Sequence, residues 1–97
     1  MRLSRVIGDV VSTTKNEKLE GFKLLLVQPV DPLTLKACGD PVVAVDTVGA
    51  GEGEVVIFVA GSSARMTSMT HERPVDSAII GIIDYVDVGG ERTFAKA

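Results

Sequence analysis

The spacing of glycine and proline constrains the fold of this chain most, because these residues cut it into short segments rich in valine and isoleucine. Short β-branched segments between such breakers are typical of an all-β domain rather than a helical one. The sequence therefore predicts five or six strands, at residues 2–13, 22–30, 42–48, 54–60, 77–88 and about 92–96.

The number and spacing of these segments predict an all-β fold with one short helix. The expected architecture is a small five-stranded, partly open β-barrel that resembles the oligonucleotide/oligosaccharide-binding (OB) type. A β-sandwich is the competing architecture. With 97 residues and no internal repeat, the chain is expected to form one domain over residues 1–97.

Glycine and proline inside the predicted strands mark irregularities. Gly8 interrupts the first strand and predicts a bulge or a tight bend, and Gly81 lies in the middle of the last long strand. Residues 22–30 are almost continuously apolar, so both faces of that strand are expected to be covered. Pro29 cannot donate a ladder hydrogen bond and predicts an edge or a bulge there.

The remaining segments are predicted to be loops and one short helix. Residues 14–21 and 31–41 are expected to be loops, and the alternate glycines of residues 49–53 predict a tight turn. The only helix is expected to begin at residues 61–66, where Ser62 or Ser63 can cap the free N–H groups. It is expected to end at or before Arg73, because Pro74 follows.

Composition disfavours some functions and points to assembly. The formal net charge is −3 and aromatic residues make up only 4% of the chain, so it lacks the basic, aromatic surface that binds nucleic acids. Hydrophobic residues nevertheless make up 45%, which is a large share for so small a domain. We therefore expect part of the apolar surface to be buried between copies of the chain.

Residue types suited to catalysis are present without a diagnostic arrangement. Ser62 or Ser63 could join His71 and either Asp76 or Asp84 in a hydrolase triad, but the flanking residues do not form a Gly-x-Ser-x-Gly elbow. Capping serines and a solvated histidine are the simpler interpretation. The sequence thus predicts no catalytic residue, and a small hydrolase that uses Ser63 and His71 is an alternative.

Metal, cofactor and membrane functions are also disfavoured. One cysteine and one histidine cannot supply the ligands of a zinc site, and residues 49–53 lack the Lys-Ser/Thr ending of a P-loop. Cys38 has no partner for an internal disulfide, as expected in a reducing cytosol. The amino terminus lacks a signal-peptide apolar run, and no apolar run could span a bilayer. We expect a soluble cytoplasmic protein without metal or cofactor.

One anion site is plausible from the residues alone. Free N–H groups at the predicted helix start could converge with Arg65 on a bound anion. Arg65 could equally pair with a nearby carboxylate such as Asp76. A barrel that binds an anion or an oligonucleotide is therefore the other alternative function.

Several motifs taken together resemble a known family. In chain order they are Ala44-Val45-Asp46, Val48-Gly49-Ala50-Gly51, Gly61-Ser62-Ser63-Ala64-Arg65, Pro74-Val75-Asp76 and Ile79-Ile80-Gly81-Ile82-Ile83-Asp84. This set resembles the vertex proteins of bacterial microcompartment shells, a family shared by carboxysomes and by ethanolamine-, propanediol- and glycyl-radical-type compartments. The resemblance covers essentially the whole chain.

The resemblance implies a five-stranded barrel with a short helix, assembled as a cyclic homopentamer. Such a ring would cap the fivefold corners of a polyhedral shell, where it would contact hexameric shell proteins. The implied role is structural, with no enzyme activity and no cofactor, in a microcompartment shell of the bacterial cytoplasm.

The resemblance also implies which residues lie near the subunit seams or the central pore. Gly49 to Gly51 would form a small-residue turn close to a neighbouring subunit. Arg65 would bind a carboxylate within the subunit or across the seam, with Asp46, Asp76 and Asp84 as candidates. The full set of interface or pore-proximal candidates is Asp46, Gly49, Ala50, Gly51, Ser62, Ser63, Arg65 and Asp76.

Overall fold

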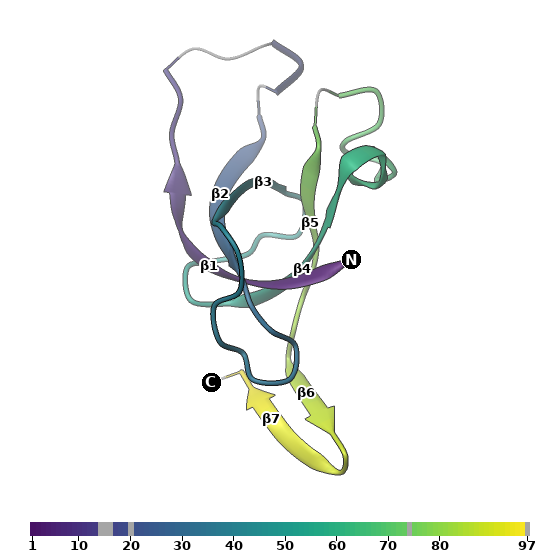
Figure 1. Ribbon diagram of the computed structural model, residues 1–97. Helices are drawn as coiled ribbons and strands as arrows, with labels where there is room; N and C mark the ends of the chain where they lie inside the picture. The colour runs from purple at the N-terminus through teal and green to yellow at the C-terminus, as the bar shows by residue number, and fades with distance from the viewer. Residues whose placement is uncertain (14–16, 20, 74, 97) are drawn as a thin grey trace.

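The computed structural model describes residues 1–13, 17–19, 21–73 and 75–96, and these are almost entirely β-structure (Figure 1). Strands β1, β2, β3, β5 and β4 hydrogen-bond in that order into a closed barrel, and β6 and β7 form a separate two-stranded sheet. All pairings are antiparallel except that of β3 with β5. The strands are β1 (Arg2–Val10), β2 (Lys23–Pro29), β3 (Val42–Asp46), β4 (Val55–Ala60), β5 (Ser77–Ile82), β6 (Tyr85–Val88) and β7 (Glu91–Ala95).

The structure confirms the predicted five-stranded barrel, although the barrel is closed rather than partly open. Closure requires strongly bent strands, and bulges supply the bends. The β1–β2 register shifts between Val6 and Gly8, as Gly8 predicted. The β4–β5 register shifts so that Ile57 pairs with Gly81 and Phe58 with Ile79. The extra residue of each bulge, Ile7 or Ile80, is followed by a glycine.

The interior of the barrel is an aliphatic core closed at one end by a loop. Its buried members are Val6, Leu25, Val27, Ala44, Ala50, Val56, Phe58 and Ile79. Ala50 comes from the connection between β3 and β4, so that connection covers the end of the core. The buried hydroxyl of Ser4 has no hydrogen-bond partner among the described residues.

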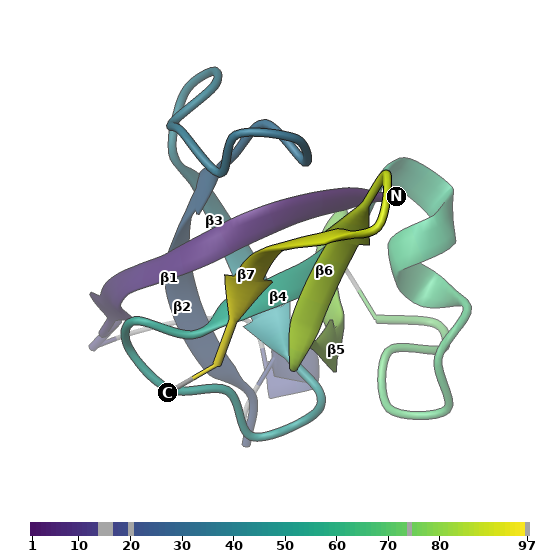
Figure 2. The same cartoon turned by 90° about the horizontal axis from the view of Figure 1, so that it is seen from below.

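A second core lies outside the barrel, against a short 3-10 helix. This helix, η2 (Gly61–Arg65), contacts β4 and β5 and buries Ala64. The buried residues of this core are Val45, Val59, Ala64, Val75 and Ala78. Figure 2 shows η2 beside the barrel rather than across its end.

The structure corrects the predicted helix. The segment at 61–66 is one 3-10 turn, neither serine caps it, and Ala60 occupies the N-cap position without a side-chain hydrogen bond. The Gly61 N–H, one of the free N–H groups at this end, donates to the Asp76 carbonyl, 2.7 Å away. A second 3-10 turn, η1 (Glu17–Leu19), lies in the predicted loop 14–21, whose residues 14–16 and 20 are outside the described residues. The predicted stop at Pro74 is also outside them.

Two predicted strands are shorter than expected, and one divides. β1 ends at Val10 and β3 at Asp46, whereas residues 77–88 form β5 and β6 with a break at residues 83–84. At the break the hydrogen-bond partner changes: the Ile83 N–H donates to the Val55 carbonyl, whereas the Asp84 carbonyl accepts from the Lys96 N–H, next to the β6–β7 hairpin. The turn at Gly89–Gly90 has positive φ at both residues, as a two-residue hairpin connection requires.

The strand predicted at residues 22–30 is confirmed as β2, but only its inner face is fully covered. Leu25 and Val27 are buried, whereas the outward Leu24 and Leu26 are half-buried. β3 pairs with β2 only as far as Val27, so Pro29 lies beyond that ladder, as its missing N–H predicted. The predicted loop 31–41 is confirmed, with one isolated bridge between Val30 and Ala37.

Candidate functional site

The glycine-rich turn after β3 is organised by one carboxylate. Asp46 accepts hydrogen bonds from the N–H groups of Val48 (3.0 Å), Gly49 (3.1 Å) and Ala50 (2.9 Å). Three N–H donors on one carboxylate form a charge-assisted cap, and Asp46 is itself 7% exposed. The turn is therefore a rigid structural element, in agreement with the prediction for residues 49–53.

The small residues of this turn differ in backbone conformation, burial and hydrogen bonding. Gly49 (φ 78°) and Gly53 (φ 89°) adopt left-handed conformations that favour glycine. Ala50 is buried in the barrel core, so the structure does not present its side chain to a neighbour. Gly51 donates its N–H to Glu54 Oε1 (2.7 Å), and a Cβ there would meet only that oxygen, at 3.5 Å.

Arg65 does not pair with a carboxylate inside the described part of the chain. Its Nη1 donates to the Val75 carbonyl (3.2 Å), which ties η2 to the segment before β5. Asp46 is engaged in the turn, and Asp76 contributes its backbone carbonyl rather than its side chain. The expected intrachain pairing of Arg65 with an aspartate is therefore wrong.

A threonine pair missed at the sequence level holds the chain after η2. Thr70 Oγ1 donates to the Ala64 carbonyl (2.6 Å) and lies 2.7 Å from Thr67 Oγ1. Thr70 is fully buried, and its own N–H donates to Thr67 Oγ1. The Thr-x-x-Thr spacing was the available signal, since a threonine can accept from an N–H three residues on.

The residues of the alternative hydrolase do not come together. The His71 Nε2 lies 3.9 Å from Glu72 Oε1, both side chains are largely exposed, and no hydrogen bond joins His71 to either Ser62 or Ser63 among the described residues. Within the same residues no group of three or more His, Cys, Asp or Glu side chains could hold a metal ion. Cys38 is exposed and unpaired.

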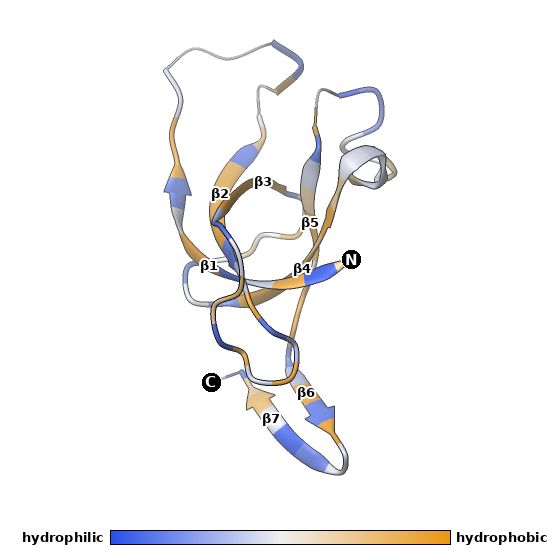
Figure 3. Cartoon of the chain, in the orientation of Figure 1, coloured by the Kyte–Doolittle hydropathy of each residue, from blue (hydrophilic) through white to orange (hydrophobic). Residues whose placement is uncertain are grey.

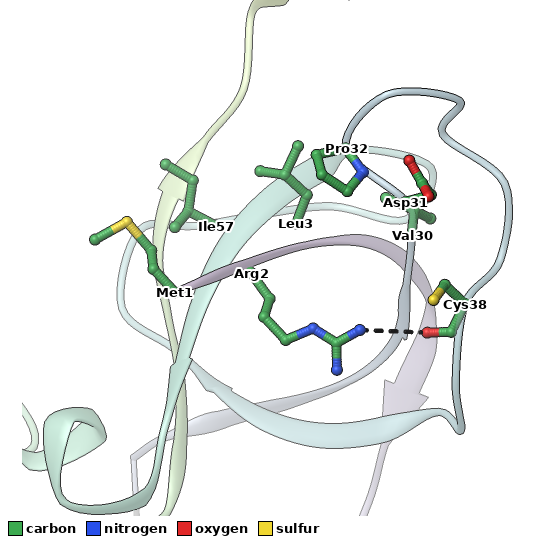
Figure 4. Close-up of a pocket in the computed structure, with 8 residues that line it drawn as sticks. All are labelled: Met1, Arg2, Leu3, Val30, Asp31, Pro32, Cys38 and Ile57. Carbon is green, nitrogen blue, oxygen red and sulfur yellow. Dashed lines mark hydrogen bonds between the residues drawn. The ribbon is translucent and has the colours of Figure 1, made fainter.

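Two surface hollows flank the amino-terminal half of β1. The first, of about 390 Å³, is mostly apolar and lies between β1, β4 and the loop after β2 (Figure 4). Arg2 also lines it, and its guanidinium extends towards the loop after β2 and donates to the Cys38 carbonyl (3.5 Å). The second, of about 520 Å³, lies between β4, β5 and η2 and includes Ser63 and Met66. Neither hollow is lined by a cluster of acid–base groups.

The aromatic side chains are not free platforms for nucleobases. Phe58 is buried in the barrel. The guanidinium of Arg92 lies 3.9 Å from the ring centre of Tyr85, and that of Arg5 lies 5.9 Å from the ring centre of Phe94. These contacts do not favour the alternative of oligonucleotide binding by stacking.

Comparison with known proteins identifies the family. The family model described as "Ethanolamine utilisation protein EutN/carboxysome" matches residues 1–84. The chain is 48% identical to the microcompartment shell vertex protein GrpN of Rhodospirillum rubrum, over 90% of this chain and 97% of that protein. It is 43% identical to the shell vertex protein EutN of Escherichia coli K12, over 99% of this chain and 100% of that protein.

The chain belongs to the EutN/CcmL family. Solved structures agree with this assignment. CcmL of Gloeobacter violaceus superposes with a TM-score of 0.92 at 42% identity, covering 99% of this chain and 98% of that one. The structure of GrpN, described as a pentameric microcompartment shell protein, gives a TM-score of 0.81 at 50% identity, covering 91% and 99%.

In this EutN/CcmL member, one ion pair ties the hairpin to the glycine turn. Lys96 Nζ lies 2.8 Å from Glu54 Oε2. The hydrogen bond to Lys96, followed by that from the Gly51 N–H, lowers the pKa of Glu54, and the Glu54 carboxylate raises the pKa of Lys96. The family model ends at residue 84, just before this hairpin begins at Tyr85. No helix in the described ranges is long and apolar enough to cross a membrane.

Proposed function

We propose that this chain is the vertex subunit of a bacterial microcompartment shell and assembles as a ring of five. The observation that carries the proposal is the near-complete match in sequence and fold to proteins named shell vertex proteins. One of those relatives is described as pentameric. The role is structural rather than enzymatic, and it places the chain in the shell of a compartment in the bacterial cytoplasm.

Geometry explains why a shell needs such a subunit. Hexagonal tiles form flat sheets, and a closed polyhedron requires fivefold positions at its corners. A ring of identical subunits uses two different patches on every copy, so each seam joins unlike surfaces. This requirement accounts for the surplus of apolar residues in a chain of 97 residues.

Native mass spectrometry of the purified chain tests the assembly. A mass of five subunits is expected over a wide range of protein concentrations. A chain that stays monomeric at every concentration would contradict the proposal.

Contact with hexameric shell proteins is a further part of the proposal. The loop at 31–41 is exposed and carries Leu33, whose side chain is 61% exposed. Such a loop can vary without disturbing the barrel, which suits contacts with neighbouring tiles. Mixing the ring with hexameric tiles should give closed particles in electron microscopy, and Leu33→Asp should reduce their number while leaving the ring intact. Unchanged particle formation by this variant would exclude Leu33 from the contact.

The turn at Gly49 to Gly51 and the residues Ser62, Ser63, Arg65 and Asp76 are proposed to lie near a seam or the pore. Gly49 is exposed and Gly51 half-exposed, while Asp46 and Ala50 hold the turn from beneath. Ser62, Ser63, Arg65 and Asp76 are all exposed. The exposed and half-exposed residues of the set could thus contact a neighbouring subunit. The buried Asp46 and Ala50 would instead keep the turn in its conformation.

Graded substitution of Gly51 tests this placement. A methyl group fits within the single chain, so Gly51→Ala should leave both the fold and the ring unchanged. Gly51→Leu should leave the circular dichroism spectrum unchanged and prevent ring assembly, as measured by light scattering. Glu52→Leu is the matched control in the same turn. A uniform pentamer from Gly51→Leu would show that no neighbour approaches this residue.

A further inference from the structure

An apolar patch covers the outer face of β1, β2 and β3. Ile7, the extra residue of the first bulge, lies beside Gly8, which pairs with Leu26, and Leu26 pairs with Val43. Val43 is 46% exposed, Ile7 is 41% exposed and Leu26 is half-buried. These residues, Ile7, Leu26 and Val43, are here called the β2 wall. Because it extends over three adjacent strands, it is a continuous patch rather than scattered exposure.

A second apolar patch covers the outer face of β1, β4 and β5. Leu3 pairs with Ile57, and Ile57 pairs with Gly81, so the three residues align across the sheet. All three are half-exposed, and we call them the β4 wall. Leu3 and Ile57 also line the apolar hollow of about 390 Å³, where they lie on the same side as Pro32 in Figure 4.

The two walls have the arrangement that a closed ring needs. In the barrel order β1-β2-β3-β5-β4, the central strands of the walls, β2 and β4, lie on either side of β1 and do not touch. A closed barrel offers no free strand edge, so another copy can pack on the barrel itself only through its side chains and loops, whereas the β6–β7 hairpin keeps free strand edges. A ring of identical copies requires two different patches per subunit, and this chain carries two.

We infer that the β2 wall of one subunit packs against the β4 wall of the next around the ring. The inference rests on the proposed pentamer and names the surfaces that form its seams. The occupant of each wall is thus a second copy of this chain. Ile7 and Val43 are exposed in the single chain, and in this arrangement they would pack against a wall that borders the apolar hollow of about 390 Å³.

The test uses one charged substitution in each wall. Val43→Glu alters the β2 wall and leaves the β4 wall intact, whereas Leu3→Lys does the reverse. A charge buried without a partner in every seam should weaken subunit association at least about a hundredfold. Native mass spectrometry should therefore show each variant mainly as a monomer at concentrations where the unaltered chain forms rings.

Mixing the two variants gives the decisive result. In a mixture, every seam between unlike variants is either intact or joins a lysine-bearing wall to a glutamate-bearing one. A closed ring of five always contains at least one seam between like variants, so the expected mixed assemblies are dimers joined through the seam of two intact walls rather than complete rings. Rings from either variant alone, or no mixed assembly from two monomeric variants, would overturn the inference.

A further variant, Gly8→Val, tests the β2 wall in case the charged variants fail to fold. Apart from its two sequence neighbours, a Cβ at Gly8 would meet no atom of its own chain within 4 Å, so the first side-chain carbon fits in the single subunit. The variant should keep the circular dichroism spectrum of the unaltered chain and associate more weakly. An undiminished ring would contradict the inference.

Val88→Glu, on the hairpin, is the matched control and should leave the ring intact. If this variant abolishes the ring while Val43→Glu does not, the hairpin rather than the β2 wall forms the seam. If the unaltered chain itself forms no pentamer, the proposed function fails before the seam is tested.

Discussion

The barrel and the β6–β7 hairpin are held together by different forces. Every barrel strand has a hydrogen-bonded neighbour on both sides and contributes to an apolar core. The hairpin is a separate two-stranded sheet with no fully buried residue, and it projects from one end of the barrel (Figure 1). Figure 3 shows the same contrast, with hydrophobic residues concentrated in the barrel strands and a hydrophilic start to β7.

The difference shows that the two regions of this small chain are stabilised by different interactions. A two-stranded hairpin is only marginally stable in water by itself. This one depends on its Gly89–Gly90 turn, on Arg92, which stacks on Tyr85 and pairs with Asp87 (3.1 Å), and on the Lys96–Glu54 pair. The barrel depends on burial. Substitutions in the two regions should therefore have separable effects.

The largest expected effect comes from emptying the barrel core. Phe58 is 3% exposed, so Phe58→Ala should lower the free energy of unfolding by about 3–5 kcal/mol. Tyr85→Ala, on the exposed hairpin, should cost less than about 1 kcal/mol. Urea unfolding at one fixed protein concentration measures both, since assembly links stability to concentration. If both variants lowered the free energy of unfolding equally, the barrel and the hairpin would not differ in how they are stabilised.

The next effect concerns the loop that closes the barrel. Asp46→Ala removes the acceptor of three N–H groups, including that of buried Ala50, and should cost about 2–3 kcal/mol. Asp46→Asn keeps one acceptor oxygen and should cost less. Thermal unfolding of the two variants gives the comparison. If both matched the unaltered chain, the carboxylate would not organise the turn.

A smaller effect is expected in the hairpin alone. Arg92→Ala removes both the stacking on Tyr85 and the ion pair with Asp87, and should destabilise the hairpin by about 1 kcal/mol. Amide hydrogen exchange should become faster in β7 and stay unchanged in β2. Arg92→Lys, which keeps the charge without the planar guanidinium, should give an intermediate result. Faster exchange in both regions would show that the hairpin supports the barrel.

The smallest expected effect is the pH dependence of the Lys96–Glu54 ion pair, which joins the hairpin to the barrel. Because the folded-state pKa of Glu54 is lowered by Lys96, the contact stabilises the fold above the ordinary carboxyl pKa and is lost as pH falls through the lowered value. Lys96 has a raised pKa, so its contribution is lost only as pH rises through that value. An NMR titration should show the Lys96 signals shifting as Glu54 protonates in acid. Glu54→Gln should abolish that shift, and its persistence would assign the shift to another group.

Much of the fold could be predicted because breakers act locally. Gly8 correctly predicted the first bulge. The break at residues 83–84 could not be predicted, because the sequence there is continuously strand-like and the decisive partner is Lys96. The serine cap was also wrong, because the 3-10 turn begins at Gly61 and Ala60, which precedes both serines, occupies the N-cap position.

The candidate site likewise contains features that the local sequence predicted and features that it did not. The sequence singled out the glycine turn but offered Asp46 only as one of three candidate partners of Arg65, although an aspartate just before such a turn commonly accepts from the N–H groups that follow it. Ala50 was expected near a neighbour and lies in the core instead. The candidates that remain exposed, Gly49, Ser62, Ser63, Arg65 and Asp76, keep their predicted role as proposals.

The sequence by itself determined the approximate strand segments and the family, because these follow from local breakers and ordered motifs. Only the tertiary structure decided which apolar residues fill the barrel and which remain on its outer walls. The physical reason is register: each bulge shifts the alternation of side chains by one residue, and the closed strand order then fixes which face meets the core.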